Sequence, residues 1–245
     1  MTMMEITTET KVGEIVKLNY ATAHIFEANH IDFCCGGNIS LDEAAEKEGL
    51  EPRNLLAEIN AAMQTKDQDA SLIDSLSLTG LCDYIVSTHH TYVNQTMPFL
   101  LKKLQKLVEV HGKNHPELKE VEASFMNATT QLTAHMNKEE SILFPYIRQM
   151  EKYRLERASR PGNLGLARVA IHQMEEEHKV EGERFMKLAE ITHGYEVPPD
   201  GCSTFEVSYK TLEEFEKDLH RHIHLENNVL FPKAVKLEKT ILDNP

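Results

Sequence analysis

The chain has 245 residues, enough for one large domain or for a medium domain with a small companion, and the composition of a globular protein. Its formal net charge of −13 argues against a nucleic-acid partner, because phosphate backbones are bound by clustered lysine and arginine. No apolar stretch approaches the roughly 18 residues of a membrane helix, and the first residues lack the features of a secretory signal, so we expect a cytoplasmic protein with no membrane partner.

Residues 1–63 are predicted to form a small helical domain built around one tight turn. Apolar residues recur at helical spacing through residues 12–26. The sequence DFCCGGN follows, in which two adjacent glycines permit backbone angles that other residues resist. Ser40 and Glu43 have the spacing of a capping box, which predicts the start of another helix, and a further helix is expected over residues 52–59.

Residues 76–245 are predicted to form four long helices, joined to the first domain by a polar linker at residues 64–75. Each helix carries an apolar stripe interrupted by histidine, or by histidine and glutamate. The stripes run through Cys82, His90 and Val108; through Val121, His135, Glu139 and Tyr146; through Ala167, His178 and Leu188; and through Phe205, His222, Glu226 and Val229. Loops rich in glycine and proline separate the helices, so the expected fold is all-α, an up-down-up-down bundle.

One eleven-residue pattern occurs twice, as HMNKEESILFP at residues 135–145 and as HIHLENNVLFP at residues 222–232. In each copy a histidine and a glutamate four residues apart project from one face of a helix. With His90 and His178 from the other two helices, four imidazoles and two carboxylates meet at one level of the bundle core. Burying these groups without partners would cost several kcal/mol, so we expect a cation among them.

Two metal ions suit this donor set better than one, because each ion can take two imidazoles and share both carboxylates as bridges. Nitrogen and oxygen donors without thiolate suit iron, manganese or zinc, and vacant positions beside two histidines per ion favour iron that handles small oxygen or nitrogen species. The prediction is a pair of non-haem iron ions with an oxo or hydroxo bridge, bound by His90, His135, Glu139, His178, His222 and Glu226. The Leu-Phe-Pro endings are interpreted as core packing that ends or kinks the helices at Pro145 and Pro232.

From His90 through Glu226 the chain resembles the hemerythrin-like di-iron proteins. DFCCGG, the doubled motif and EVPPDGCST together are similar, over nearly the whole chain, to the iron-sulfur cluster repair family, the YtfE, ScdA and DnrN group. That resemblance implies a bacterial cytoplasmic protein that restores iron-sulfur clusters after oxidative or nitrosative stress, with damaged iron-sulfur proteins as partners. It implies the same six metal ligands, both glutamates bridging. Oxygen-carrying hemerythrins have one further histidine on one iron, for which this sequence shows no clear position.

The chemistry at such a site is left open by the sequence. Two adjacent irons can bind nitric oxide and reduce it to nitrous oxide, a reductase-type activity, or can donate iron to a damaged cluster. The alternative from another class is a module that binds or senses oxygen or nitric oxide without turnover. An oxidase of organic substrates is disfavoured, because the carboxylate-rich ligand set of that class is missing. Whether the chain forms a homodimer is also left open.

Cys34 and Cys35 form a second candidate site, as exposed redox-active thiolates or a transient metal handle. The alternative is that they simply fill a tight turn, and the family resemblance favours the functional interpretation. Glu177 is a candidate for relaying protons or lining an access path, or else belongs to a solvated acidic face. Cys82, on the His90 stripe, and Cys202, in a loop, are interpreted as structural. The spacings of the four cysteines suggest neither a disulfide framework nor a zinc ribbon.

The remaining histidines are expected outside the core. His90 rather than His89 should face inward, and His89 and His172 are predicted to be surface neighbours of the site. Solvated positions near helix ends or on polar faces are predicted for His111, His115, His193, His220 and His224. Of these, His111 is the one expected nearest to the periphery of the site.

Overall fold

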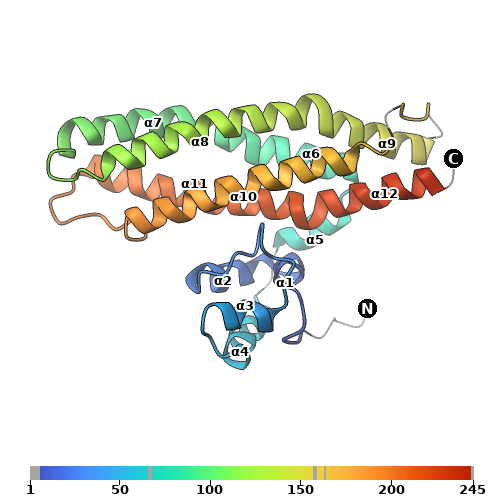
Figure 1. Cartoon of the computed structure of the whole chain (residues 1–245), viewed down its shortest axis with the longest axis horizontal. Helices are drawn as coiled ribbons and strands as arrows, with labels where there is room; N and C mark the ends of the chain where they lie inside the picture. Colours follow the sequence, from blue (N-terminus) through green and yellow to red (C-terminus); the bar gives the residue numbers. More distant parts are fainter. Residues whose placement is uncertain (1–5, 66–67, 157–158, 163, 244–245) are drawn as a thin grey trace.

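The computed structural model describes residues 6–65, 68–156, 159–162 and 164–243. In these ranges the chain is helical and has no strand, only an isolated antiparallel bridge between Lys11 and Ser40. A long four-helix bundle lies above a small helical amino-terminal domain in Figure 1. The predicted all-α class and up-down-up-down bundle are therefore confirmed. None of the described helices is both long and apolar enough to cross a membrane.

Short helices around a loop make up the amino-terminal domain. They are α1 (Val12–Leu18), the 3-10 turn η1 (Tyr20–Thr22), α2 (Ala23–Ala28), α3 (Leu41–Lys47) and α4 (Pro52–Ala62). The expected capping box is present: the Ser40 hydroxyl accepts from the Glu43 N–H at 3.1 Å, and the Glu43 carboxylate accepts from the Ser40 N–H at 3.1 Å. Within the predicted linker a helix, α5, covers Gln68–Ser75.

Three of the four bundle helices contain a π-helical turn. The first helix is α6 (Leu78–Ile85), η2 (Val86–His90) and α7 (Thr91–His111), and the second is α8 (Leu118–Lys138), η3 (Glu139–Leu143) and α9 (Phe144–Glu156). The third is α10 (Ala167–Ile191), and the fourth is α11 (Ser203–Leu225), η4 (Glu226–Leu230) and α12 (Phe231–Asp243). All three π turns lie at the same level of the bundle as the predicted metal ligands.

Pro145 and Pro232 do not end their helices, so the first of the two outcomes expected from the sequence, an end or a kink, is wrong. Each is the second residue of a thirteen-residue helix, α9 or α12. Each also follows a π turn, in which i→i+5 bonding has already interrupted the α-helical ladder, so the N–H that proline lacks is not required there. The Leu-Phe pairs before both prolines are buried, as the packing interpretation predicted.

The apolar core of the bundle is divided by the layer that holds the predicted ligands. On one side lies a cluster that includes Phe125, Phe185 and Phe215 and extends into the amino-terminal domain. On the other side lies a cluster from α6, α9, α12 and the start of α10. The two apolar clusters therefore seal the polar layer from both ends of the bundle.

Two glutamates on α9 and α12 fix the start of neighbouring helices. The Glu151 carboxylate accepts from the backbone N–H groups of Leu78 at 2.8 Å and Thr79 at 2.9 Å, at the start of α6. Buried Glu238 accepts from the N–H of Ala167 at 3.2 Å, at the start of α10. Negative charge beside the first N–H groups of a helix stabilises it, so these contacts hold the far end of the bundle together.

Replacing Phe215 by alanine should lower the free energy of unfolding by about 3–5 kcal/mol, because its fully buried ring packs 5.3 Å from that of Phe125 and 5.5 Å from that of Phe185. Urea unfolding of the metal-free protein measures the change. Phe99→Ala is the matched control, since Phe99 is 45% exposed and its loss should cost no more than about 1 kcal/mol. Equal losses for both variants would contradict this account of the core.

Candidate metal centre

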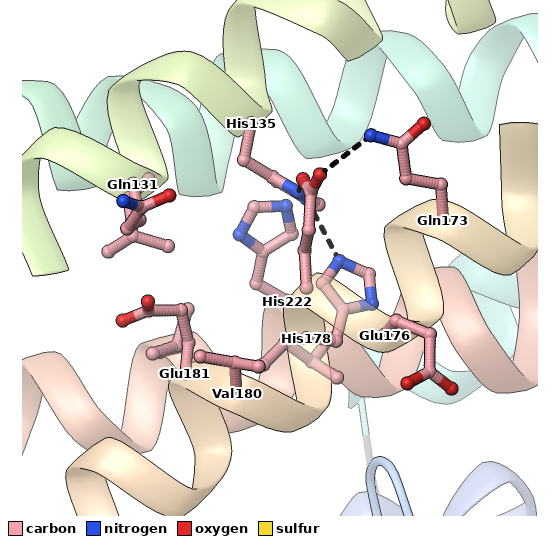
Figure 2. A pocket seen from close by; sticks show the side chains of 12 residues that line it. Gln131, His135, Gln173, Glu176, His178, Val180, Glu181 and His222 are labelled. Carbon is pink, nitrogen blue, oxygen red and sulfur yellow. Dashed lines mark hydrogen bonds and ion pairs between the residues drawn. The ribbon is translucent and has the colours of Figure 1, made fainter.

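A cavity of about 240 Å³ leads from the bundle surface to the polar layer between α8, α10 and α11 (Figure 2). Its rim carries exposed polar side chains, among them Gln131, Gln173 and Glu176. Its inner wall is formed by buried side chains that include His135, His178 and His222. Small molecules therefore have a path to the buried histidines.

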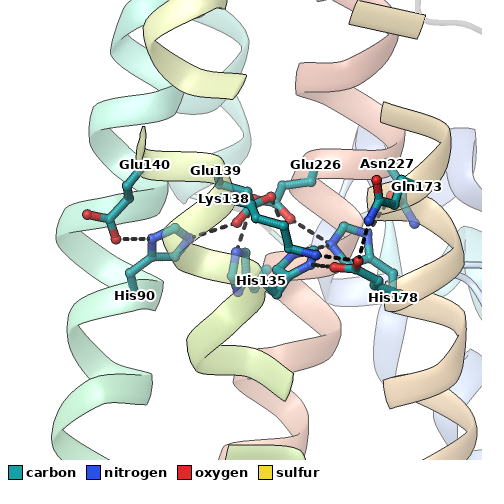
Figure 3. A network of polar contacts seen from close by, with 11 residues as sticks. His90, His135, Lys138, Glu139, Glu140, Gln173, His178, Glu226 and Asn227 are labelled. Carbon is teal, nitrogen blue, oxygen red and sulfur yellow. Dashed lines mark hydrogen bonds and ion pairs between the residues drawn. The ribbon is translucent and has the colours of Figure 1, made fainter. Parts of the chain in front are cut away.

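The six predicted ligands lie together in the structure, and Figure 3 shows most of them in one layer across the bundle. None is more than 4% exposed. Glu139 and Glu226 are each the first residue of a π turn, and His90 is the last residue of another. A π turn adds one residue to a helical turn, and such turns are frequent at functional sites. Local helix geometry therefore presents these side chains to the centre of the bundle.

Each glutamate lies between two histidines from different helices. The two oxygens of Glu139 are 3.3 Å from His135 Nε2 and 3.4 Å from His90 Nε2. The two oxygens of Glu226 are 3.1 Å from His222 Nε2 and 3.0 Å from His178 Nε2. Ligand atoms within 4.8 Å of one another thus form a first half-site, His90 and His222 with both glutamates, and a second half-site, His135 and His178 with both glutamates.

The donor atoms fit a pair of metal ions. His90 Nε2, both oxygens of Glu139 and one oxygen of Glu226 are buried and have no hydrogen-bond partner among the described residues, which is costly for polar atoms unless a cation binds them. The Nε2 atoms of His135 and His178 are 2.9 Å apart. Two nitrogens at about 2.1 Å from one ion, at right angles, would lie roughly 3.0 Å apart.

The electrostatics of the layer favour cations. Burial opposes ionisation of Glu226, but His222 and His178 hold its pKa well below the usual range. Burial and the neighbouring Glu226 also raise the pKa of Glu139, yet His135 and His90 outweigh them and the pKa is lowered. Burial disfavours a charged His135, but Glu139 and other carboxylates raise its pKa to about 9. The metal-free layer therefore keeps two carboxylate charges that protons on histidine partly balance.

Three of the four histidines are held by a hydrogen-bond partner on Nδ1, the ring nitrogen that faces away from Glu139 and Glu226. Such partners fix the tautomer and leave Nε2 free to bind a metal. They are Glu140 for His90 at 2.8 Å, Glu177 for His135 at 2.9 Å and Asn227 for His178 at 2.8 Å. Glu177 also accepts from Lys138 and from Gln173, and it lines the cavity.

Comparison with known proteins agrees with this geometry. Residues 83–234 match the hemerythrin HHE cation binding domain, and residues 8–63 match ScdA_N, a domain of unknown function. The iron-sulfur cluster repair protein ScdA of Staphylococcus haemolyticus is 32% identical over 228 residues, which cover 93% of this chain and 99% of that protein. The chain belongs to the ScdA and YtfE family.

Two further members of this family show a similar degree of likeness. The iron-sulfur cluster repair protein YtfE of Yersinia pseudotuberculosis is 34% identical over 214 residues, 87% of this chain and 91% of that protein. The YtfE protein of Yersinia pestis matches to the same extent. The resemblance predicted from the doubled motif and DFCCGG is therefore confirmed.

The position of His89 was predicted wrongly. His89 is 1% exposed, its Nδ1 is 2.9 Å from the Asp218 carboxylate, and its ring stacks on that of His222. The π turn at residues 86–90 changes the helical phase, so that both adjacent histidines are buried. His224 is also buried, at 2% exposure, rather than solvated. His172 is exposed, as predicted.

The cysteine loop, residues 32–37, lies against the bundle. Asp32 accepts from the N–H groups of Cys34 at 3.0 Å and Cys35 at 2.9 Å, and the two sulfurs are 3.7 Å apart. Exposure was predicted for both thiols, but Cys34 is buried and Cys35 is only partly exposed. A hydrogen bond to Cys35, together with burial, raises the pKa of Cys34 well above its usual range, so Cys34 is a thiol rather than a thiolate.

Cys82 and Cys202 differ in environment, although both were interpreted as structural. Cys82 is fully buried, and burial raises its pKa to about 12. Cys202 is exposed at the start of α11, with its sulfur 3.3 Å from His111 Nε2. That hydrogen bond and backbone N–H groups lower the pKa of Cys202 to about 7. His111 ends α7, twenty-one residues beyond His90, and is therefore not at the periphery of the site.

Alkylation of Cys202 by iodoacetamide should rise with a midpoint near pH 7, because the thiolate is the reactive form and its pKa is lowered to about 7. In His111→Ala the midpoint should move up toward the ordinary thiol value of about 8.5. Mass spectrometry of peptides after timed labelling measures both. Buried Cys82 is the internal control and should stay unlabelled in the folded protein; the same midpoint in both proteins would exclude a role for His111.

Proposed function

We propose that the chain is a non-haem di-iron protein that takes part in the repair of iron-sulfur clusters damaged by oxidative or nitrosative stress. The observation that carries this proposal is the pair of half-sites that share two buried glutamates at the inner end of a cavity. Relatives named for iron-sulfur cluster repair, matched over most of the chain, favour repair over a module that only binds or senses oxygen or nitric oxide. Damaged iron-sulfur proteins are the expected partners.

In this proposal the first ion is held by His90 and His222 and the second by His135 and His178. Glu139 and Glu226 would be shared by both ions, since each has one oxygen toward each half-site. Imidazole and carboxylate donors without thiolate suit iron. A bound iron pair supplies binding and reduction of nitric oxide, a reductase-type activity, or iron that can be donated to a damaged cluster.

The protein's own residues control access and protons. The two apolar clusters exclude water from both ends of the layer, and the cavity admits small molecules such as nitric oxide or oxygen from one side. Glu177 accepts a hydrogen bond from Nδ1 of His135 and lies in the cavity wall. It is thus placed to keep that histidine in its metal-binding tautomer and to pass protons between the rim and the layer.

The cysteine loop and the division into domains belong to the same proposal. Cys34 and Cys35 are assigned a redox or metal-handling role beside the bundle. We divide the chain into a domain at residues 1–63, a linker at 64–75 and the di-iron bundle at 76–245, supported by the family matches at 8–63 and 83–234. All four cysteines are free, as is usual in the reducing cytoplasm, where we place the protein.

Anaerobically purified wild-type protein should contain about two irons per chain, and the double variant Glu139→Ala with Glu226→Ala should lose both, because the shared ligands are gone. Metal analysis and the absorption spectrum before and after nitric oxide measure this. Glu183→Ala, which removes an exposed charge on α10, is the control and should keep the iron. Zinc or no metal in the wild type, with no response to nitric oxide, would overturn the di-iron proposal.

The double variant Cys34→Ser with Cys35→Ser should keep its iron but lose most of its ability to reactivate an iron-sulfur enzyme that nitric oxide has inactivated. The reason is that these thiols lie beside the bundle without belonging to either half-site. Recovered enzyme activity and iron content are measured together. Cys202→Ser is the control, as Cys202 lies at the start of α11 and away from the loop. Full repair by the double variant would remove the cysteines from the mechanism.

A further inference from the structure

The Nδ1 partner of His178 connects the metal layer to the amino-terminal domain. Asn227 Oδ1 lies 2.8 Å from His178 Nδ1, and Asn227 Nδ2 donates to the backbone carbonyl of Cys34 at 3.2 Å. Figure 3 shows Asn227 beside His178 at one edge of the layer. One amide side chain thus contacts both a predicted metal ligand and the cysteine loop.

The Cys34 carbonyl decides which way this amide faces. A carbonyl oxygen only accepts hydrogen bonds, so the NH₂ group of Asn227 must point to Cys34, and its oxygen must point to His178. That oxygen in turn needs a proton on His178 Nδ1. In the neutral imidazole the other ring nitrogen, Nε2, then presents toward Glu226 and His135 the lone pair that a metal ligand needs. A backbone group in one domain therefore sets the tautomer of a histidine in the other.

The repeated motif provides an internal comparison. Asn227 follows the bridging Glu226, and Glu140 occupies the equivalent place after Glu139. Glu140 holds His90 Nδ1 at 2.8 Å, but its side chain is 44% exposed. A carboxylate accepts through either oxygen and needs no orienting partner, whereas an amide does. In the second copy of the motif, therefore, the orientation of Asn227 depends on the position of the cysteine loop.

The loop is seated on segments that carry ligands. Asn228 also donates to the Cys34 carbonyl, at 3.3 Å. The Cys35 sulfur lies 3.7 Å from the position that a Cβ on Gly182 would occupy, one helical turn beyond His178 on α10. Within the loop, a Cβ on Gly37 would lie 2.4 Å from the Phe33 backbone oxygen. A single methyl group added at Gly37 should therefore change how the cysteine loop packs against the bundle.

We propose that Asn227 is a positioning residue that makes metal affinity at the second half-site depend on the docking of the cysteine loop. When the loop is seated, the amide holds His178 in its metal-binding tautomer. When the loop moves away, the amide can rotate and donate to Nδ1, which places the proton on Nε2 and removes a ligand. The inference rests on the proposed function, because it requires a metal at the second half-site.

The test is a competition titration of the metal-free, full-length protein with ferrous ion and a chelator under anaerobic conditions, which resolves two stepwise affinities. Asn227→Leu should weaken one of the two affinities about 10- to 100-fold, the range for loss of an outer partner of a metal-binding histidine. Lys236→Ala, which removes an exposed charge on α12, is the control and should leave both affinities within about threefold.

Two more variants separate positioning from packing. Gly37→Ala, which displaces the loop without touching a ligand, should weaken one affinity about tenfold. Asn227→Asp should retain wild-type affinity, since its carboxylate holds His178 without help from the loop, and in that background Gly37→Ala should have no effect. Circular dichroism melting confirms that each variant is folded.

Each contrary result has a defined meaning. A wild-type protein that binds fewer than two ions would overturn the proposed function and this inference together. Two ions in the wild type with unchanged affinities in Asn227→Leu would overturn the inference alone. So would an unchanged affinity in Gly37→Ala, because the loop would then have no influence. Equal losses in Asn227→Asp and Asn227→Leu would show a packing role, which also overturns it.

Discussion

Two carboxylates without any exposed area, Glu139 and Glu226, impose the constraint on which the rest of the bundle depends. A charge in an apolar interior is tolerated only beside compensating charge and hydrogen bonds. Four histidines provide part of that compensation, and three of them are held in turn at Nδ1 by Glu140, Glu177 and Asn227. Packing in the apolar clusters on both sides stabilises the bundle, while the layer between them is suited to binding cations.

The π turns show how the helices accommodate this layer. The turn at residues 86–90 buries both His89 and His90, and the turn that opens at Glu139 moves the buried stripe from Tyr146 to Ile147. Each turn gives up part of the regular hydrogen-bond ladder, and this local cost is offset by the geometry of the centre.

Periodicity was sufficient to predict the four helices and the six residues of the layer, because a 3.6-residue stripe places His135 and Glu139 on one face whatever the helix packs against. It failed where the phase changed, which is why His89 was assigned to the surface. It was also silent on Glu140 and Asn227, since their roles depend on a histidine in another helix. Loop docking on Asn227 follows from tertiary contacts that no local pattern encodes.

The cavity described at the inner histidines sets a size limit on exchange with any partner. Its volume of about 240 Å³ suits a few diatomic molecules or a hydrated ion, but no segment of a folded protein. In the proposed repair function, an iron-sulfur cluster still bound to its own polypeptide would come no closer than the rim, where Gln173 and Glu176 are exposed. Under that proposal, whatever is exchanged would cover the last stretch to the histidines alone, as a diffusing gas molecule or a single metal ion.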